Sequence, residues 1–153
     1  MERTPAERSV CAMSMAIGTT PTDRLETPVR SIMRPGVVSV SDDASLLQAK
    51  RALVRHGVHA ILIVGAGNGQ PLGWVTDRGL LSWLEHDLAL VSAGHAITEP
   101  ATYIEPGATA RDALAELRTP GVSHLLVART SGTAPQGVVA SLDLVELVAG
   151  ERR

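Results

Sequence analysis

An internal repeat constrains the fold of this chain more than any other feature of its sequence. Gly73 and Gly137 lie 64 positions apart, and the same shift superposes many further residues. The matching pairs are Ala49 with Ala113, Leu53 with Leu117, Gly57-Val58 with Gly121-Val122, Leu62 with Leu126, Pro71 with Pro135, Val75 with Val139 and Leu80 with Leu144. A unit of about 60 residues buries too little surface to be stable alone, so we expect the two copies to pack face to face.

The first helix of each copy has a clear start signal. Ser45 with Gln48, and Thr109 with Asp112, form capping boxes, in which a hydroxyl accepts from a free backbone N–H and the later side chain reaches back. Apolar residues at helical spacing follow each box, and Gly57 or Pro120-Gly121 ends the helix.

The segments around these helices predict strands and a second helix. The almost continuous apolar runs HAILIV and SHLLVA are typical of strands that are covered on both faces. The predicted order in each copy is a leading strand (37–40, 102–104), the capped helix, two strands (59–64 and 72–76, 123–128 and 136–140) and a last helix (about 77–86, 141–149). The fold class is therefore α/β (α+β), with two tandem β-α-β-β-α units related by a pseudo-two-fold axis.

These elements suggest the boundaries of the repeats. We assign repeat 1 to residues 28–90 and repeat 2 to residues 91–150. Thr27-Pro28 has the chemistry of a helix start, so a short helix is expected over about 28–33, with a counterpart near 92–98. Residues 1–26 have no sustained apolar period and are interpreted as a flexible tail.

Composition excludes several classes of function. The 153 residues carry a net charge of −2 and few aromatic side chains, which argues against nucleic-acid binding. No apolar run approaches the roughly 18 residues of a membrane span. Cys11 is the only cysteine, so a cysteine zinc cage is impossible and a reducing cytoplasm is expected. His56 and His59 flank a helix end and have no third ligand, so no metal site is predicted.

The junction of the last strand and helix, GWVTDRGLL in copy 1 and GVVASLDLV in copy 2, follows the pattern Gly-apolar-apolar-Thr-x-x-Asp in part. With SIMRPGVVSV, GVHAILIV, ITEPATYI and GVSHLLVA, it makes residues 28–149 resemble a pair of CBS domains, named from cystathionine β-synthase. The resemblance implies a regulatory module, not an enzyme, that binds AMP, ADP, ATP or S-adenosylmethionine between its repeats. It also implies a homodimer formed through the helices and a separate effector partner.

Each copy keeps half of the family's junction signature. Copy 1 has Thr76 but Gly79 at the aspartate position, whereas copy 2 has Ala140 at the threonine position and Asp143 at the aspartate position. The resemblance implies that Asp143 holds the ribose hydroxyls, and Ser141 is a candidate substitute for the lost threonine hydroxyl. A helix N-terminus attracts phosphate, so the Thr76 cleft could bind one with help from Arg78.

The remaining candidates lie near the expected position of adenine. His59 and His124 begin the second strand of each copy, and Val38 and Thr102 belong to the leading strands. The resemblance implies that backbone groups beside these strands hold the base.

Other interpretations of the same residues stay open. Thr76 could be a plain helix cap, and Asp143 could simply favour the helix dipole. The whole chain could also be a structural or dimerisation module whose clefts no longer bind nucleotide.

Overall fold

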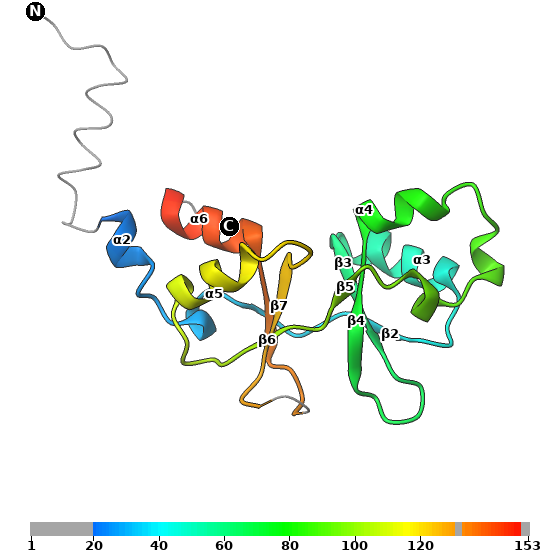
Figure 1. Ribbon diagram of the computed structural model, residues 1–153, viewed down its shortest axis with the longest axis horizontal. Coiled ribbons are helices and arrows are strands. Elements are labelled where there is room, and N and C mark those ends of the chain that lie inside the picture. Colours follow the sequence, from blue (N-terminus) through cyan, green and yellow to red (C-terminus); the bar gives the residue numbers. More distant parts are fainter. Residues whose placement is uncertain (1–19, 131–132, 151–153) are drawn as a thin grey trace, which may run out of the picture.

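The computed structural model describes residues 20–130 and 133–150, which form two four-stranded sheets with helices on their outer sides (Figure 1). The first sheet has the order β2-β3-β4-β5 and the second has the order β1-β8-β7-β6. The strands of the first sheet are β2 (Ser39–Ser41), β3 (Ala60–Val64), β4 (Pro71–Thr76) and β5 (Glu99–Pro100). Those of the second are β1 (Arg34–Pro35), β6 (Tyr103–Ile104), β7 (His124–Val127) and β8 (Gly137–Ala140). The predicted fold of two tandem β-α-β-β-α units is confirmed.

Each sheet has the same pairing pattern. The leading strand, β2 or β6, runs parallel to the strand that follows the capped helix, and the next strand returns antiparallel. Leu62 therefore faces Trp74 in the first sheet, as Leu126 faces Val138 in the second. Residues 64 positions apart in the sequence thus occupy equivalent positions in the strand pairing of the two sheets.

The edge strands are exchanged between the repeats. β1 lies at the start of repeat 1 but pairs with β8 of repeat 2, and β5 of repeat 2 pairs with β4 of repeat 1. These crossings explain the repeated glycines. A Cβ on Gly73 would lie 2.6 Å from the carbonyl oxygen of Glu99, and one on Gly137 would collide with that of Arg34. Each glycine lets an edge strand from the other repeat approach closely.

The capped helices form as predicted. They are α3 (Leu46–His56) and α5 (Ala110–Leu117), and both capping boxes are present with both reciprocal bonds. Gly57 ends α3 in the left-handed conformation, with φ of 62°, where a side chain would be strained. The last helix of repeat 2 is α6 (Ser141–Ala149).

The last helix of repeat 1 is much shorter than the predicted 77–86. The α-helix α4 (Asp77–Leu80) lasts one turn and continues as the 3₁₀ turn η2 (Leu81–Trp83). Gly79 lies within that first turn and lowers helix propensity. The expected helices over 28–33 and near 92–98 are 3₁₀ turns, η1 (Val29–Ser31) and η4 (Ala93–Ala96), and η3 (Leu88–Leu90) precedes the latter.

The end of the segment interpreted as a tail is part of the fold. Residues 21–24 form the short helix α2 (Pro21–Arg24), which Thr20 caps. Arg24 Nη1 donates to the carbonyl oxygen of Val148 at 2.8 Å, and Arg111 pairs with Glu26 at 2.9 Å. These contacts attach residues 20–26 to repeat 2; residues 1–19 of the predicted tail lie outside the described residues.

Three apolar clusters hold the structure together. One lies in repeat 1, between the first sheet and α3, and a second lies in repeat 2. The third joins the two sheets and includes Leu62, Trp74 and Leu126. The exchange of edge segments extends into the cores, since Val29 packs in the repeat 2 cluster and Ala93 packs in the repeat 1 cluster. The two repeats are therefore interlocked, with clefts where their sheets meet.

Candidate functional site

The central cleft is a cavity of about 350 Å³ to which both repeats contribute. Repeat 1 supplies the chain around β1, the end of α3 and the start of β3, and repeat 2 supplies β7, β8 and the start of α6. The lining residues are Arg34, Pro35, Gly36, Val37, Val38, Gly57, Val58, His59, Ala60, Trp74, His124, Val138, Ala140, Leu142 and Asp143. Most of these are apolar, so the walls suit a flat hydrophobic group and the polar contacts come from a few side chains.

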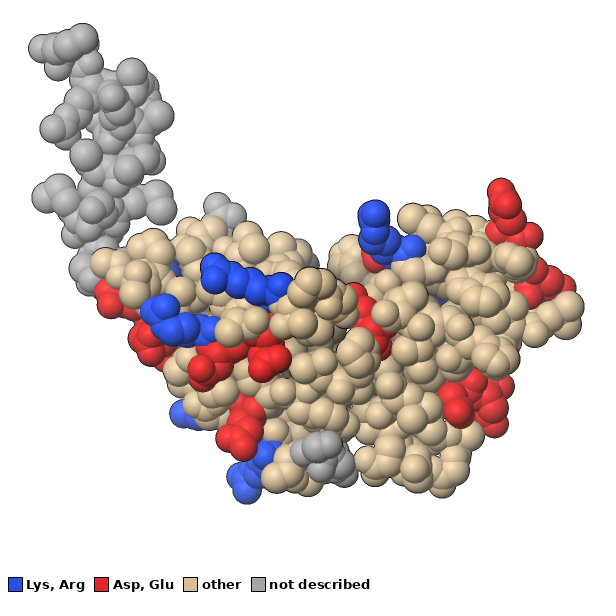
Figure 2. All heavy atoms as spheres, viewed as in Figure 1, with Lys and Arg blue, Asp and Glu red and all other residues tan. Residues whose placement is uncertain are grey.

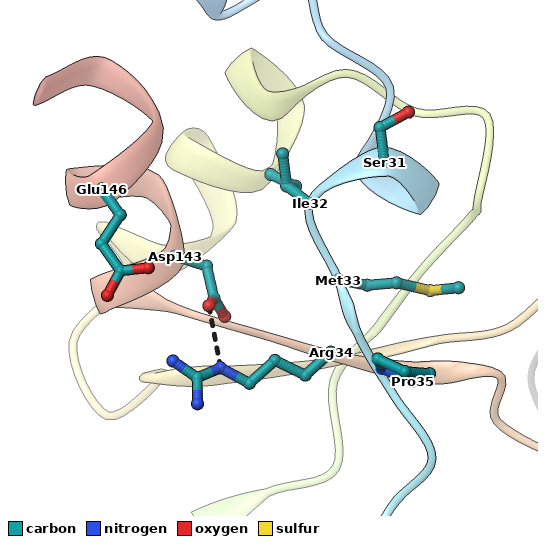
Figure 3. A pocket seen from close by; sticks show the side chains of 7 residues that line it. All are labelled: Ser31, Ile32, Met33, Arg34, Pro35, Asp143 and Glu146. Carbon is teal, nitrogen blue, oxygen red and sulfur yellow. Dashed lines mark hydrogen bonds and ion pairs between the residues drawn. The ribbon is translucent and has the colours of Figure 1, made fainter. Parts of the chain in front are cut away.

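Asp143 is the buried acidic group of this cleft, with 6% of its side chain exposed. Its Oδ2 accepts from the N–H of Ala140 at 2.7 Å, and its Oδ1 accepts from Arg34 Nε at 3.1 Å. Figure 3 shows that the Arg34 side chain extends away from the backbone of β1 toward Asp143 in the first turn of α6, where it makes this contact. Charge-assisted hydrogen bonds of this kind hold both side chains in a defined position.

The same ion pair also lines a second cavity, of about 320 Å³. It is lined by Ser31, Ile32, Met33, Arg34, Pro35, Asp143 and Glu146 (Figure 3). The two cavities share Arg34, Pro35 and Asp143. The ion pair therefore stands at the boundary between them.

Trp74 and His124 form the inner wall of the central cleft. Their ring centroids are 5.2 Å apart, and His124 Nδ1 lies 2.8 Å from the hydroxyl of Ser123. Burial lowers the pKa of His124, although the carboxylates of Glu99 and Asp143 oppose the shift, so the neutral ring is favoured. The Trp74 Nε1–H is buried and has no hydrogen-bond partner among residues 20–130 and 133–150.

The Thr76 cleft is a separate cavity of about 430 Å³, which His59 and His124 share with the central cleft. It is lined by His59, Thr76, Asp77, Arg78, Gly79, Thr98, Glu99, Gly121, Ser123 and His124. Thr76 Oγ1 accepts from the N–H of Gly79 at 2.9 Å and so caps α4. Helix α4 is a single turn, so it has little dipole to offer an anion.

Gly79 has a steric reason to lack a side chain. A Cβ at this position would lie 2.7 Å from Cγ2 of Thr98 and 3.1 Å from Thr76 Oγ1. Thr98 thus fills the space that the carboxylate of an aspartate would need. The glycine therefore accommodates a side chain from the crossing segment.

The two carboxylates of the Thr76 cleft, Asp77 and Glu99, are hydrogen-bonded within the chain. Ser123 Oγ lies 2.8 Å from both carboxylate oxygens of Glu99, and the Ser123 N–H donates to the same carboxylate at 3.1 Å. His59 Nδ1 lies 2.8 Å from Asp77 Oδ2, and this hydrogen bond is the main cause of a lowered pKa of Asp77. This cleft is therefore richer in carboxylates than the central one.

The predicted site residues divide between the two clefts. Asp143, His59, His124 and Val38 line the central cleft; Thr76 and Arg78 line the other, together with the same two histidines. Ser141 is an exposed residue at the start of α6. The carbonyl of Thr102 accepts from the N–H of Leu126 at 2.8 Å, which supports the sheet.

Sequence reasoning missed Arg34, Thr98 and Glu99. The edge-strand pairing makes Arg34-Pro35 the structural counterpart of Glu99-Pro100. Arg34 pairs with Val138 and Glu99 pairs with Trp74, and Val138 and Trp74 occupy equivalent positions in the two repeats. These dipeptides lie 65 positions apart, one more than the repeat shift. A search that allowed this one-residue insertion would have found the pair, but not its crossing to the other sheet.

Figure 2 shows basic and acidic residues interspersed on one face of the molecule, without a field of one sign. In the part of the chain that the structure describes, no group of three or more His, Cys, Asp or Glu side chains is placed to hold a metal ion. No helix among the same residues is long and apolar enough to cross a membrane.

The fold and the central cleft define a tandem-repeat module that encloses a cavity between its halves. The chain belongs to the CBS-domain family, whose model matches residues 29–86 and 93–150. It is a CBS-domain pair, a regulatory module, which confirms the resemblance read from the sequence. No curated protein matches the sequence significantly.

Solved structures of CBS-domain proteins share this fold. The CBS domain of a bacterial CNNM/CorC-family Mg²⁺ transporter, solved in complex with ATP, is 23% identical, with a TM-score of 0.73 over 97% of this chain and 100% of that chain. Hypoxic Response Protein I with two coordinated zinc ions is 23% identical, with a TM-score of 0.64 over 78% and 98% of the two chains. A CBS-domain-containing protein from Agrobacterium tumefaciens is 21% identical, with a TM-score of 0.68 over 80% and 94%.

Proposed function

We propose that this protein senses an adenosine-containing ligand, such as AMP, ADP, ATP or S-adenosylmethionine, in its central cleft and acts on a separate partner. The observation that carries the proposal is the cavity of about 350 Å³, which has apolar walls from both repeats and the Asp143 carboxylate at its edge. Apolar walls favour a purine base, and a carboxylate is a good acceptor for the two vicinal hydroxyls of a ribose.

The start of α6 supports this choice of cleft over the other. Ala140 is the N-cap residue of α6, and its methyl side chain cannot accept a hydrogen bond from the backbone N–H groups of the first turn. Thr76, by contrast, already caps α4. A nine-residue helix also offers an anion a larger dipole than a single turn does. The ATP complex of the transporter's CBS domain lends further support to an adenine nucleotide.

We also propose that the protein works as a homodimer through its helices. Large apolar side chains are exposed on α3, around η2 and on α6: Val54, Leu81, Leu84, Leu142 and Val145. Helices α4 and α6 lie on the same side of the molecule in Figure 1. Leu142 is exposed and also lines the central cleft, next to Asp143. A ligand that moves the first turn of α6 would therefore change this surface and shift the equilibrium between dimer geometries.

A structural or dimerisation module without a ligand is the second candidate. The observation in its favour is that the Asp143 carboxylate already has two hydrogen-bond partners within the chain. In this case the ion pair would simply lock the crossing strand to α6.

Thermal unfolding in the presence of AMP, ADP, ATP, S-adenosylmethionine and NAD separates the two candidates. Ligand at 100 times its dissociation constant stabilises the folded state by about 2.7 kcal/mol, which raises the melting temperature of a domain this size by several degrees. A shift with an adenosine-containing ligand supports the sensor. No shift with any of them would leave the structural module.

A further inference from the structure

We propose that Arg34 exchanges its bond with Asp143 for a bond to the phosphate of the ligand, so that the central cleft selects phosphorylated adenosine over adenosine and over S-adenosylmethionine. This inference rests on the proposed function, because it concerns the same cleft. It names the chemical class of ligand and a residue that decides between the candidates.

The argument starts from the oxygens of Asp143. Oδ2 is held by the N–H of Ala140 at 2.7 Å, within the first turn of α6, and Oδ1 is held by Arg34 Nε at 3.1 Å. A ribose that donates hydroxyl hydrogen bonds to this carboxylate competes with Arg34 for the same acceptor. Arg34 must then find another anion or lose its partner.

Arg34 is built to make such an exchange. Its backbone is fixed by β1, which pairs with Val138 of β8, whereas 52% of its side chain is exposed. The side chain lines both cavities, so rotation about its side-chain bonds can direct the guanidinium into either one. A planar guanidinium matches a phosphate with two parallel N–H···O bonds, which a water molecule cannot replace at equal strength.

Charge decides among the adenosine ligands. Of the residues that line the central cavity, Arg34 is the permanent cation and Asp143 the carboxylate, and His124 is kept mainly neutral by burial. Once ribose hydroxyls occupy Asp143, the released guanidinium favours a ligand with negative charge. S-adenosylmethionine brings a sulfonium cation instead, and adenosine brings no charge.

The other cleft has the opposite arrangement at the equivalent positions. The counterpart of Arg34 is Glu99, on the edge strand β5, and the counterpart of Asp143 is Gly79. Glu99 is bound to Ser123, so this cleft presents a carboxylate where the central cleft presents a guanidinium. Arg78 lines the Thr76 cleft beside the carboxylates of Asp77 and Glu99, whereas an arginine paired with the junction aspartate occurs in the central cleft. The exchange of partners that we propose therefore concerns the central cleft.

Isothermal calorimetry of the wild type and of Arg34→Gln with AMP, ADP, ATP, adenosine and S-adenosylmethionine tests the inference. The wild type should prefer AMP to adenosine by about 10- to 100-fold, the range expected for hydrogen bonds to charged groups. In Arg34→Gln this ratio should fall to near one, because adenosine no longer competes with Arg34 while AMP loses its partner. Arg34→Lys should keep part of the preference, since it keeps the charge but not the fork.

Arg51→Gln is the matched control. It removes the same charge from the exposed side of α3, outside both clefts, and should leave the AMP-to-adenosine ratio unchanged. Circular dichroism and thermal unfolding establish that each variant is folded before its affinity is compared.

The outcomes separate this inference from the proposed function. If the wild type binds none of the five compounds, the proposed function fails and the inference fails with it. If the wild type binds AMP and adenosine equally, or if folded Arg34→Gln keeps the preference for AMP, the sensor stands and the role of Arg34 is wrong.

Discussion

The glycine in the first turn of α4 provides a direct test of how the two repeats interlock. Replacing a helical glycine with alanine ordinarily stabilises a protein by up to about 1 kcal/mol, because alanine has the higher helix propensity. At Gly79 the added methyl would lie 2.7 Å from Thr98 Cγ2, which is closer than carbon atoms approach in proteins. Overpacking of this kind costs about 1–3 kcal/mol. We therefore expect Gly79→Ala to lower the free energy of unfolding by about 1 kcal/mol.

A double-mutant cycle isolates the cause. Thr98→Ala removes Cγ2 and Oγ1, whose hydrogen bonds to Thr76 Oγ1 and to the Trp74 carbonyl are long, at 3.4 and 3.5 Å, so it should cost little by itself. In the Thr98→Ala background, Gly79→Ala should become neutral or stabilising. The coupling free energy between the two sites should be about 2 kcal/mol.

Urea unfolding of the wild type, the two single variants and the double variant measures this coupling. Gly67→Ala is the control, because a Cβ on Gly67 meets nothing within 4 Å and should leave stability unchanged or slightly raised. If Gly79→Ala stabilises the wild type as helix propensity alone predicts, the packing of Thr98 against the α4 turn is not as described. Additive effects of the two changes would refute the reasoning equally.

Three further predictions concern the clefts. Asp143→Ala should abolish ligand binding, whereas Thr76→Ala should weaken it less. If calorimetry gave the reverse order, the ligand would bind in the Thr76 cleft and not in the central cleft. Burial lowers the pKa of His124 below its usual 6.5, so the unfolded chain binds the proton more readily than the folded chain. The folded state therefore loses stability as the pH falls from 6.5 toward the lowered pKa of this residue. Urea unfolding between pH 8 and pH 5 should therefore show a smaller loss in a His124→Gln variant, and an unchanged pH dependence would contradict the assignment. In a Trp83→Phe background, Trp74 should report ligand binding by a change in fluorescence because it lines the central cleft, and a silent Trp74 in a chain that binds ligand would argue against that cleft.

The asymmetry between the clefts follows from two coordinated differences. Where the first turn of the last helix carries Asp143, the crossing segment supplies Arg34, which neutralises the carboxylate. Where that turn carries Gly79, the crossing segment supplies Thr98, which fills the empty space. Each junction residue is thus matched to a side chain from the segment that crosses over from the other repeat. Replacing Arg34 alone would leave the Asp143 charge buried, and adding a side chain at Gly79 alone would create a clash.

Local signals in the sequence were sufficient to predict the helices that begin with a capping box. Ser45 and Thr109 start α3 and α5 as expected, and Gly57 ends α3, because these effects depend on neighbours within four residues. The apolar runs predicted the central strands for the same reason. The helix expected over 77–86 was too long, because Gly79 weakens it: the α-helix ends at Leu80 and the chain continues as the 3₁₀ turn η2.

The internal repeat by itself determined that the chain consists of two β-α-β-β-α units, and the junction residues identified Asp143 and Thr76 as the positions to examine. Only the tertiary structure decided which segments meet. The crossing of β1 and β5 to the opposite sheets brings Arg34 to Asp143 and Thr98 to Gly79, and the contact of Arg24 with Val148 attaches residues 20–26 to repeat 2. These pairs are separated by about 20 to more than 120 positions, so no local propensity encodes them; they form because two small sheets can bury their inner faces only against each other.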